Sequence, residues 1–135
     1  FQAAGAAPIV KGKIVKNPDT IATAIRIGNP ASWAQAVEAR DVSGGVIDSV
    51  TDNEILAAYR LIAAKEGIFV EPSSAAGLAG LIKHKKAGKL PSGKTIVITV
   101  TGHGLKDIPY ALDAAKKPVV VPVDVKAAAK ALGLK

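Results

Sequence analysis

The chain has 135 residues, of which 49% are hydrophobic and 21% charged, and this composition excludes a disordered polypeptide. Cysteine is absent, so disulfide frameworks and thiolate metal sites are excluded, and no apolar run approaches the roughly 20 residues of a membrane span. The net charge of +7 comes mainly from scattered lysines, whereas nucleic-acid surfaces cluster arginines among aromatic residues, so we expect neither a nucleic-acid nor a membrane partner.

Segments with strand and helix character alternate along the chain. The predicted strands and extended stretches are apolar and rich in β-branched residues; they lie at 6–10, 45–51, 68–72, 95–101 and 118–124. The predicted helices carry start signals, stop signals or an apolar face; they lie at 18–28, 30–42, 51–67, 74–88, 108–115 and 125–132. Apolar strands separated by helices predict an α/β fold, with a mostly parallel sheet covered by helices on both faces.

Two of the predicted helices have the clearest starts. Thr51 and Glu54 form a Thr-x-x-Glu capping box, and Gly67 supplies the stop signal for the same helix. Ser73 or Ser74 is expected to cap the following helix. The first half of that helix is apolar on every side and should be buried, and its lysine-rich end suits the helix dipole.

Two strand ends are candidate ligand sites, because ligands of parallel sheets bind beyond the carboxyl ends of the strands. Glu71 follows one strand and is either a partner of the next helix N-terminus or part of a pocket wall. Thr101 opens the turn "TGHG" after another strand, where it either closes a turn or faces a ligand. Gly102 and Gly104 are needed there if the backbone has positive φ or lies close to a ligand.

Other chemistries fit the sequence less well. Gly102 and Gly104, with Asp124 further along, partly match a dinucleotide fingerprint, but Asp107 stands where the third glycine belongs. The two histidines have no metal-ligand spacing, so no metal site is expected. His84 lies among lysines and is predicted to face solvent.

Four stretches in this order, "FQAAGAAPIV", "TIATAIRIGNPASW", "FVEPSSAA" and "VTGHGLKD", resemble the threonine synthases, a family of fold-type II enzymes that use pyridoxal 5′-phosphate (PLP). The resemblance extends from residue 1 to about residue 112. It implies that residues 1–135 form the C-terminal part of the PLP-binding large domain of a longer enzyme. It also implies conversion of O-phospho-L-homoserine and water to L-threonine and phosphate.

The resemblance also implies site residues. Thr101 matches the threonine that hydrogen-bonds the pyridine nitrogen of PLP. Further residues match the wall of the same pocket: Ala4, Gly5, Glu71, Ser73 and Gly102. Arg26 either helps bind the substrate phosphate or fixes a structural corner with Trp33, and the structural role is the one we expect.

The family pattern includes parts that this chain does not contain. The lysine that anchors PLP covalently lies in a Ser-x-Lys-Asp-Arg context, and no lysine here has that context. We therefore expect this chain to be catalytically silent alone, and to act with the N-terminal part of the enzyme in a cytoplasmic homodimer. The alternative is a non-catalytic α/β module that binds a small anion or a nucleotide.

Overall fold

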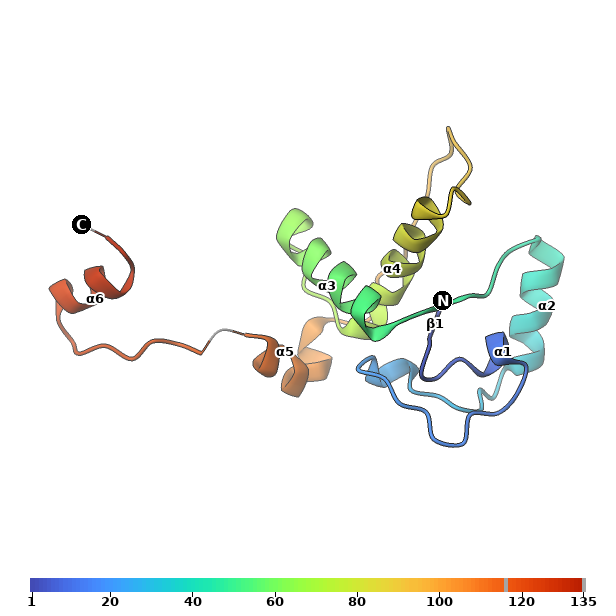
Figure 1. Cartoon of the computed structure of the whole chain (residues 1–135), viewed down its shortest axis with the longest axis horizontal. Coiled ribbons are helices and arrows are strands. Elements are labelled where there is room, and N and C mark those ends of the chain that lie inside the picture. Colours follow the sequence, from blue (N-terminus) through green and yellow to red (C-terminus); the bar gives the residue numbers. More distant parts are fainter. Residues whose placement is uncertain (116, 135) are drawn as a thin grey trace.

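Two long helices lie side by side at the centre of the structure, α3 (Asp52–Glu66) and α4 (Pro72–Lys86) (Figure 1). The computed structural model describes residues 1–115 and 117–134. The remaining elements are short; they are α1 (Pro8–Lys11), the 3₁₀ helix η1 (Thr23–Ile25), α2 (Trp33–Ser43), the 3₁₀ helix η2 (Gly104–Asp107), α5 (Ile108–Ala114) and α6 (Val125–Ala131).

A small parallel sheet joins the start of the chain to the segment before α3. Strand β1 (Gln2–Ala3) pairs with β2 (Ser49–Val50), with Ala3 opposite Val50. The Ala4 N–H continues this pairing with a hydrogen bond of 2.7 Å to the Val50 carbonyl. Helix α4 packs against β2, so the molecule has the predicted combination of parallel strands and helices.

Helix α3 begins and ends where the sequence predicts. Thr51 Oγ1 accepts from the Glu54 N–H at 3.3 Å, and the Glu54 carboxylate accepts from the Thr51 N–H at 2.7 Å, which completes the capping box. Gly67 ends the helix with a left-handed φ of 67°.

The N-cap of helix α4 lies two residues before Ser73 and three before Ser74, the two predicted caps. Glu71 is its N-cap residue, without a capping hydrogen bond from the side chain, and Pro72 occupies the first helical position. Proline suits this position because its φ is fixed near the helical value and its missing N–H would have no partner there. The prediction of Ser73 or Ser74 as the cap is therefore wrong, and both serine side chains are left to contact other segments.

The core lies where α3, α4 and the sheet meet. Its buried residues are mostly small and aliphatic; they are Ala3, Ala22, Val50, Ile55, Ala58, Tyr59, Val70, Ala75, Ala76 and Ala79. Small side chains on α4 permit close approach of its neighbours, and burial of Ile55 stabilises the fold by roughly 1.5–3 kcal/mol. The ring of Phe1 lies over Gly80, where a Cβ atom would be only 2.2 Å from the ring.

The predicted helix at 18–28 is reduced to the single 3₁₀ turn η1. Thr20 explains the difference, because its hydroxyl accepts from the Ala22 N–H at 3.2 Å and thereby competes with helical hydrogen bonding. The carbonyl of Thr20 accepts from the Arg26 guanidinium, at 2.9 Å from Nε. This bond supports the structural role expected for Arg26. Trp33, at the start of α2, is only half-buried and lies outside the core.

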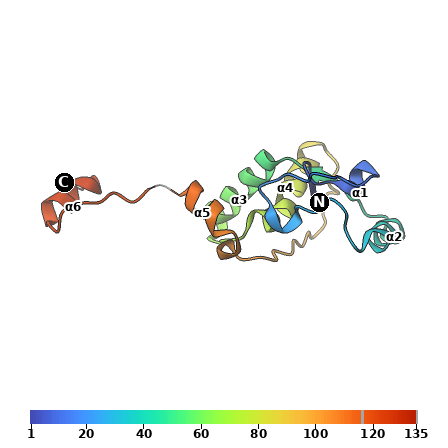
Figure 2. The same cartoon turned by 90° about the horizontal axis from the view of Figure 1, so that it is seen from below.

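The prediction of strands at 95–101 and 118–124 is wrong, because neither segment is a regular strand. Within the described residues, neither segment forms a strand ladder, and Val97 and Val120 are 85% and 94% exposed. An apolar extended segment becomes a strand only when a neighbouring strand supplies hydrogen-bond partners, and no described segment does so here. Residues 117–124 lead to α6, which stands apart from the other helices in both views (Figures 1 and 2). No helix in the described parts of the chain has the length and apolar character needed to cross a membrane.

Candidate functional site

The turn after residue 100 is held against the first turn of α4 by one serine. Ser74 Oγ accepts from the Gly102 N–H at 2.6 Å and from the Thr101 N–H at 3.2 Å. It also lies 2.9 Å from Thr101 Oγ1. Ser74 is 5% exposed, whereas Thr101 is exposed. Thr101 is thus an exposed residue whose hydroxyl lies against the buried Ser74 and whose backbone is fixed by it.

Backbone hydrogen bonds join the same turn to the segment that precedes α4. The Glu71 N–H donates to the Gly102 carbonyl at 2.9 Å, and the Gly104 N–H donates to the Phe69 carbonyl at 3.1 Å. Residues 70 and 103 form an isolated antiparallel bridge. The two strand ends that the sequence marked as candidate sites therefore lie together.

Gly102 and Gly104 are required by packing, not by left-handed backbone. Neither has positive φ. A Cβ on Gly102 would lie 1.8 Å from Glu71 Oε1, and a Cβ on Gly104 would lie 2.3 Å from Cζ of Phe69. The buried Glu71 side chain thus packs beneath Gly102, and these contacts account for both glycines.

The 3₁₀ turn η1 lies beside this junction. Ser73 Oγ accepts from the Ala24 N–H at 3.2 Å, and Thr23 Oγ1 donates to the buried Asp107 carboxylate at 2.9 Å. No local sequence pattern marks this pair, because Thr23 and Asp107 are separated by 84 residues. Burial, and then the charge of Asp107, raise the pKa of the nearby Tyr59.

Ala4 and Gly5 lie at the end of the small sheet. The Lys11 ammonium donates to the Ala4 carbonyl at 2.9 Å, and a Cβ on Gly5 would lie 1.7 Å from the Asp19 carbonyl oxygen. Among the described residues, no hydrogen bond joins Ala4 or Gly5 to Thr101. Their place in the pocket wall stays a prediction.

A charged cluster occupies the other end of α4. The Asp48 carboxylate lies 3.0 Å from Lys83 Nζ and 3.1 Å from His84 Nε2. Partial burial favours a higher pKa for Asp48, but the Ser49 N–H, Lys83 and His84 together hold that pKa well below its usual range. His84 is also in edge contact with the Phe1 ring, so the prediction that it faces solvent is wrong.

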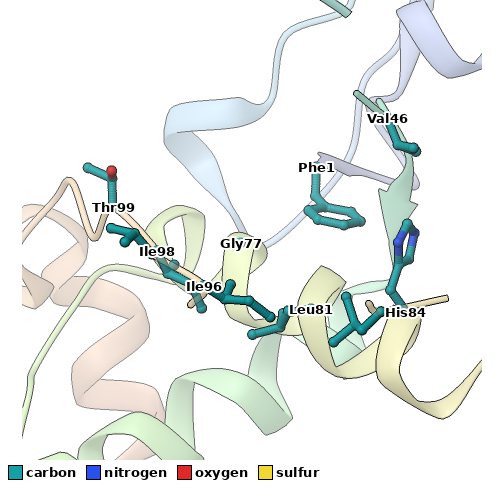
Figure 3. A pocket seen from close by; sticks show the side chains of 10 residues that line it. Phe1, Val46, Gly77, Leu81, His84, Ile96, Ile98 and Thr99 are labelled. Atoms are coloured by element: carbon teal, nitrogen blue, oxygen red, sulfur yellow. The ribbon is translucent and has the colours of Figure 1, made fainter. Parts of the chain in front are cut away.

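An apolar groove of about 410 Å³ runs along α4 (Figure 3). Its lining is mostly hydrophobic; it comprises Phe1, Val46, Gly77, Leu81, His84, Leu90, Ile96, Val97, Ile98 and Thr99. Among the described residues that line it, only His84 and Thr99 bring polar side chains, whereas a phosphate-bearing cofactor needs several hydrogen-bond donors. We therefore place the candidate site at the Thr101 turn, which does not line this groove.

Comparison with known proteins identifies the class. Residues 1–102 match the family described as "Pyridoxal-phosphate dependent enzyme", and the chain belongs to this family. It is 59% identical over 114 residues to the threonine synthase of Bacillus sp. (strain ULM1), an alignment that covers 84% of this chain and 32% of that protein. It is 56% identical over 133 residues to the threonine synthase of Mycobacterium leprae, covering 98% of this chain and 37% of the relative. The chain thus spans about a third of the length of these curated relatives.

Solved structures confirm the fold class. An L-serine ammonia-lyase from Rhizomucor miehei matches with a TM-score of 0.58 at 24% identity, over 84% of this chain and 39% of that structure. Maize serine racemase matches with a TM-score of 0.54 at 23% identity, over 83% of this chain and 37% of that structure. At this level of identity the likeness shows the fold alone, and it agrees with the predicted fold-type II class.

The residues at the Thr101 turn fit one end of the family cofactor. A pyridine nitrogen without a proton is a hydrogen-bond acceptor, and Thr101 is an exposed residue with a fixed backbone and a hydroxyl that can donate. Gly102 adds no side chain beside it, and the Glu71 carboxylate packs beneath Gly102. The donor chemistry is therefore suited to the ring nitrogen of PLP.

Proposed function

We propose that this chain is the C-terminal part of the large domain of a threonine synthase. In the complete enzyme the reaction converts O-phospho-L-homoserine and water to L-threonine and phosphate. The observation that carries this proposal is the 54–59% identity to three bacterial threonine synthases over 84–98% of the chain. The L-serine ammonia-lyase and the serine racemase that share the fold are far less similar, at 23–24% identity.

Thr101 is the residue of this chain that would contact PLP, through a hydrogen bond from its hydroxyl to the ring nitrogen. When bound, PLP supplies an electron sink for bond breaking at the substrate carbons, and the protein positions it. A hydroxyl is a neutral partner, so it does not require a proton on the ring nitrogen, as a carboxylate partner would. The candidate pocket-wall residues would limit the space around the ring; they are Ala4, Gly5, Glu71, Ser73 and Gly102.

The covalent anchor of PLP would come from polypeptide outside this chain, because no lysine here stands in the Ser-x-Lys-Asp-Arg context. The same holds for the Gly/Asn-rich loop that cradles the PLP phosphate. We propose that the complete enzyme is a cytoplasmic homodimer. The 135-residue chain alone, mixed with PLP and borohydride, should then give no stoichiometric pyridoxyl-lysine by intact mass. A single stoichiometric adduct on one lysine would contradict this division of roles.

The activity is tested with the complete protein and O-phospho-L-homoserine. The expected result is release of phosphate and threonine in equal amounts, and loss of both products when PLP is removed. L-serine serves as the competing substrate. Ammonia release from serine without phosphate release from O-phospho-L-homoserine would favour the chemistry of the structural neighbours. Binding of phosphate without turnover of either substrate would favour a non-catalytic anion-binding module.

A further inference from the structure

We infer that Ser74 is a positioning residue that sets the direction of the Thr101 hydroxyl proton. This inference rests on the proposed function, in which that hydroxyl donates to the ring nitrogen of PLP. The structure provides the geometry, because Ser74 Oγ lies 2.9 Å from Thr101 Oγ1 and is buried beneath it.

The direction follows from the hydrogen bonds that Ser74 already accepts. A serine hydroxyl has one proton to donate and two lone pairs. The Gly102 N–H, at 2.6 Å, and the Thr101 N–H, at 3.2 Å, both donate to Ser74 Oγ and occupy these lone pairs. Ser74 therefore has no lone pair left for the Thr101 hydroxyl, and between the two hydroxyls only Ser74 can be the donor.

The proton of Ser74 has two acceptors within reach, and both leave the proton of Thr101 free. Thr101 Oγ1 is the nearer at 2.9 Å, and the Gly102 carbonyl is at 3.2 Å. That carbonyl already accepts from the Glu71 N–H at 2.9 Å. Within the described part of the chain, no group accepts a proton from Thr101 Oγ1.

The two hydroxyls thus form a series of hydrogen bonds in which Ser74 donates to Thr101 and Thr101 donates outward. Donation from Ser74 polarises the Thr101 hydroxyl and strengthens the bond that it donates in turn. A ligand group that accepts a hydrogen bond from Thr101 would complete this series. A ring nitrogen that carries no proton meets this requirement, so Ser74 would act on the cofactor through Thr101 without touching it.

A double-mutant cycle in the complete enzyme tests this inference. PLP is titrated into the apoenzyme of wild type, Ser74→Ala, Thr101→Ala and the double variant, and the dissociation constants are compared. Loss of one hydrogen bond corresponds to about a fivefold change, so Ser74→Ala should weaken PLP binding about fivefold when Thr101 is present. In the Thr101→Ala background, Ser74→Ala should change the dissociation constant for PLP by less than about twofold. Ser43→Ala is the matched control, since Ser43 is an exposed serine whose hydroxyl bonds within α2.

The outcomes separate this inference from the proposed function. If Thr101→Ala leaves PLP binding unchanged, the proposed contact between Thr101 and the cofactor is wrong. If Thr101→Ala weakens binding but Ser74→Ala has the same effect in both backgrounds, Ser74 serves only the fold and the inference is overturned.

A second variant covers the case in which Ser74→Ala does not fold, since it leaves two backbone N–H groups without an acceptor. Ser74→Cys keeps a weaker donor and acceptor of similar shape. We expect a smaller loss of PLP affinity that again disappears in the Thr101→Ala background. Equal losses in the two backgrounds would overturn the inference here as well.

Discussion

The two ends of helix α4 hold neighbouring segments by different chemistry. At its N-terminal end, the Ser74 hydroxyl binds the backbone of residues 101 and 102 and lies beside the Thr101 hydroxyl. At its C-terminal end, Lys83 and His84 bind the Asp48 carboxylate beside the small sheet. The side-chain contacts to the 101–102 turn thus come from a hydroxyl group, whereas the ion pairs with Asp48 lie at the opposite end of the helix.

This difference indicates a separation of functions along one helix. A carboxylate in direct contact with the ring nitrogen would favour its protonation, whereas the group proposed to contact it is the neutral Thr101 hydroxyl; the Glu71 carboxylate lies beneath Gly102. The charged cluster serves packing of the sheet against α4, where a charge-assisted bond stabilises a fixed contact. Substitutions at the two ends should therefore give different phenotypes, changes in cofactor chemistry at one end and changes in stability at the other.

The largest effect is expected from Thr101→Ala in the complete enzyme. PLP should stay attached through its covalent anchor, but turnover should fall at least about tenfold, because the ring loses its partner at the nitrogen. Steady-state phosphate release measures this change. Thr99→Ala is the control on the same segment and should stay within about twofold of wild type. Unchanged turnover in Thr101→Ala would mean that the residue only closes a turn.

A smaller effect, on stability, is expected from Gly102→Ala. The new Cβ would lie 1.8 Å from Glu71 Oε1, so the buried Glu71 side chain must move. We expect a loss of about 1.5 kcal/mol in the free energy of unfolding, measured by urea denaturation. Gly77→Ala on α4 is the control, because its Cβ would meet Ile98 at an ordinary 3.4 Å. Equal stability of the two variants would show that the 102 turn is not tightly packed.

Asp48→Asn should reduce stability by about 1 kcal/mol at neutral pH, with no effect on PLP affinity. The variant loses the charge that Lys83 and His84 face, and the contact is partly exposed and therefore screened. Urea denaturation and a PLP titration measure the two quantities separately. Asp41→Asn, in an exposed pair with Arg40, is the control and should show no measurable change. A loss of PLP affinity in Asp48→Asn would contradict the separation between the two ends of α4.

The smallest effect is the acid dependence of the same contact. The pKa of Asp48 is lowered in the folded protein, so its contribution to stability is complete above the unfolded pKa near 4 and is lost as pH falls toward the lower folded value. The stability difference between wild type and Asp48→Asn should shrink to below about 0.5 kcal/mol at pH 2. A stability difference between the two proteins that stays constant from pH 7 to pH 2 would show that the charge of Asp48 does not contribute to stability.

The sequence predicted what depends on local patterns. The capping box at Thr51 and the stop at Gly67 were confirmed because both signals act within one helix turn. The buried first half of α4 was also confirmed, because its residues are apolar on every side. Membership of the PLP-dependent enzymes was predicted correctly from four short stretches, and the match over residues 1–102 confirms it.

The sequence could not predict what depends on distant partners. The segment at 95–101 has the composition of a strand, but strands need neighbours, and composition does not supply them. Ser74 and Thr101 are 27 residues apart, and His84 and Asp48 are 36 apart, so neither contact has a local signature. The sequence predicted a need for Gly102 and Gly104 only if the backbone has positive φ or lies close to a ligand; neither has positive φ, and the contacts with Glu71 and Phe69 arise only in the fold.

The Phe1 ring occupies the space that a side chain at position 80 would need, which restricts sequence variation at these two positions. Because a methyl group at position 80 would overlap the Phe1 ring at 2.2 Å, that ring must move when position 80 gains a side chain. A smaller residue at position 1 should leave room for alanine at position 80. A variant that combines both substitutions should therefore lose less stability than a variant with either substitution alone. Homologous chains with alanine at position 80 are accordingly expected to carry a reduced side chain at position 1.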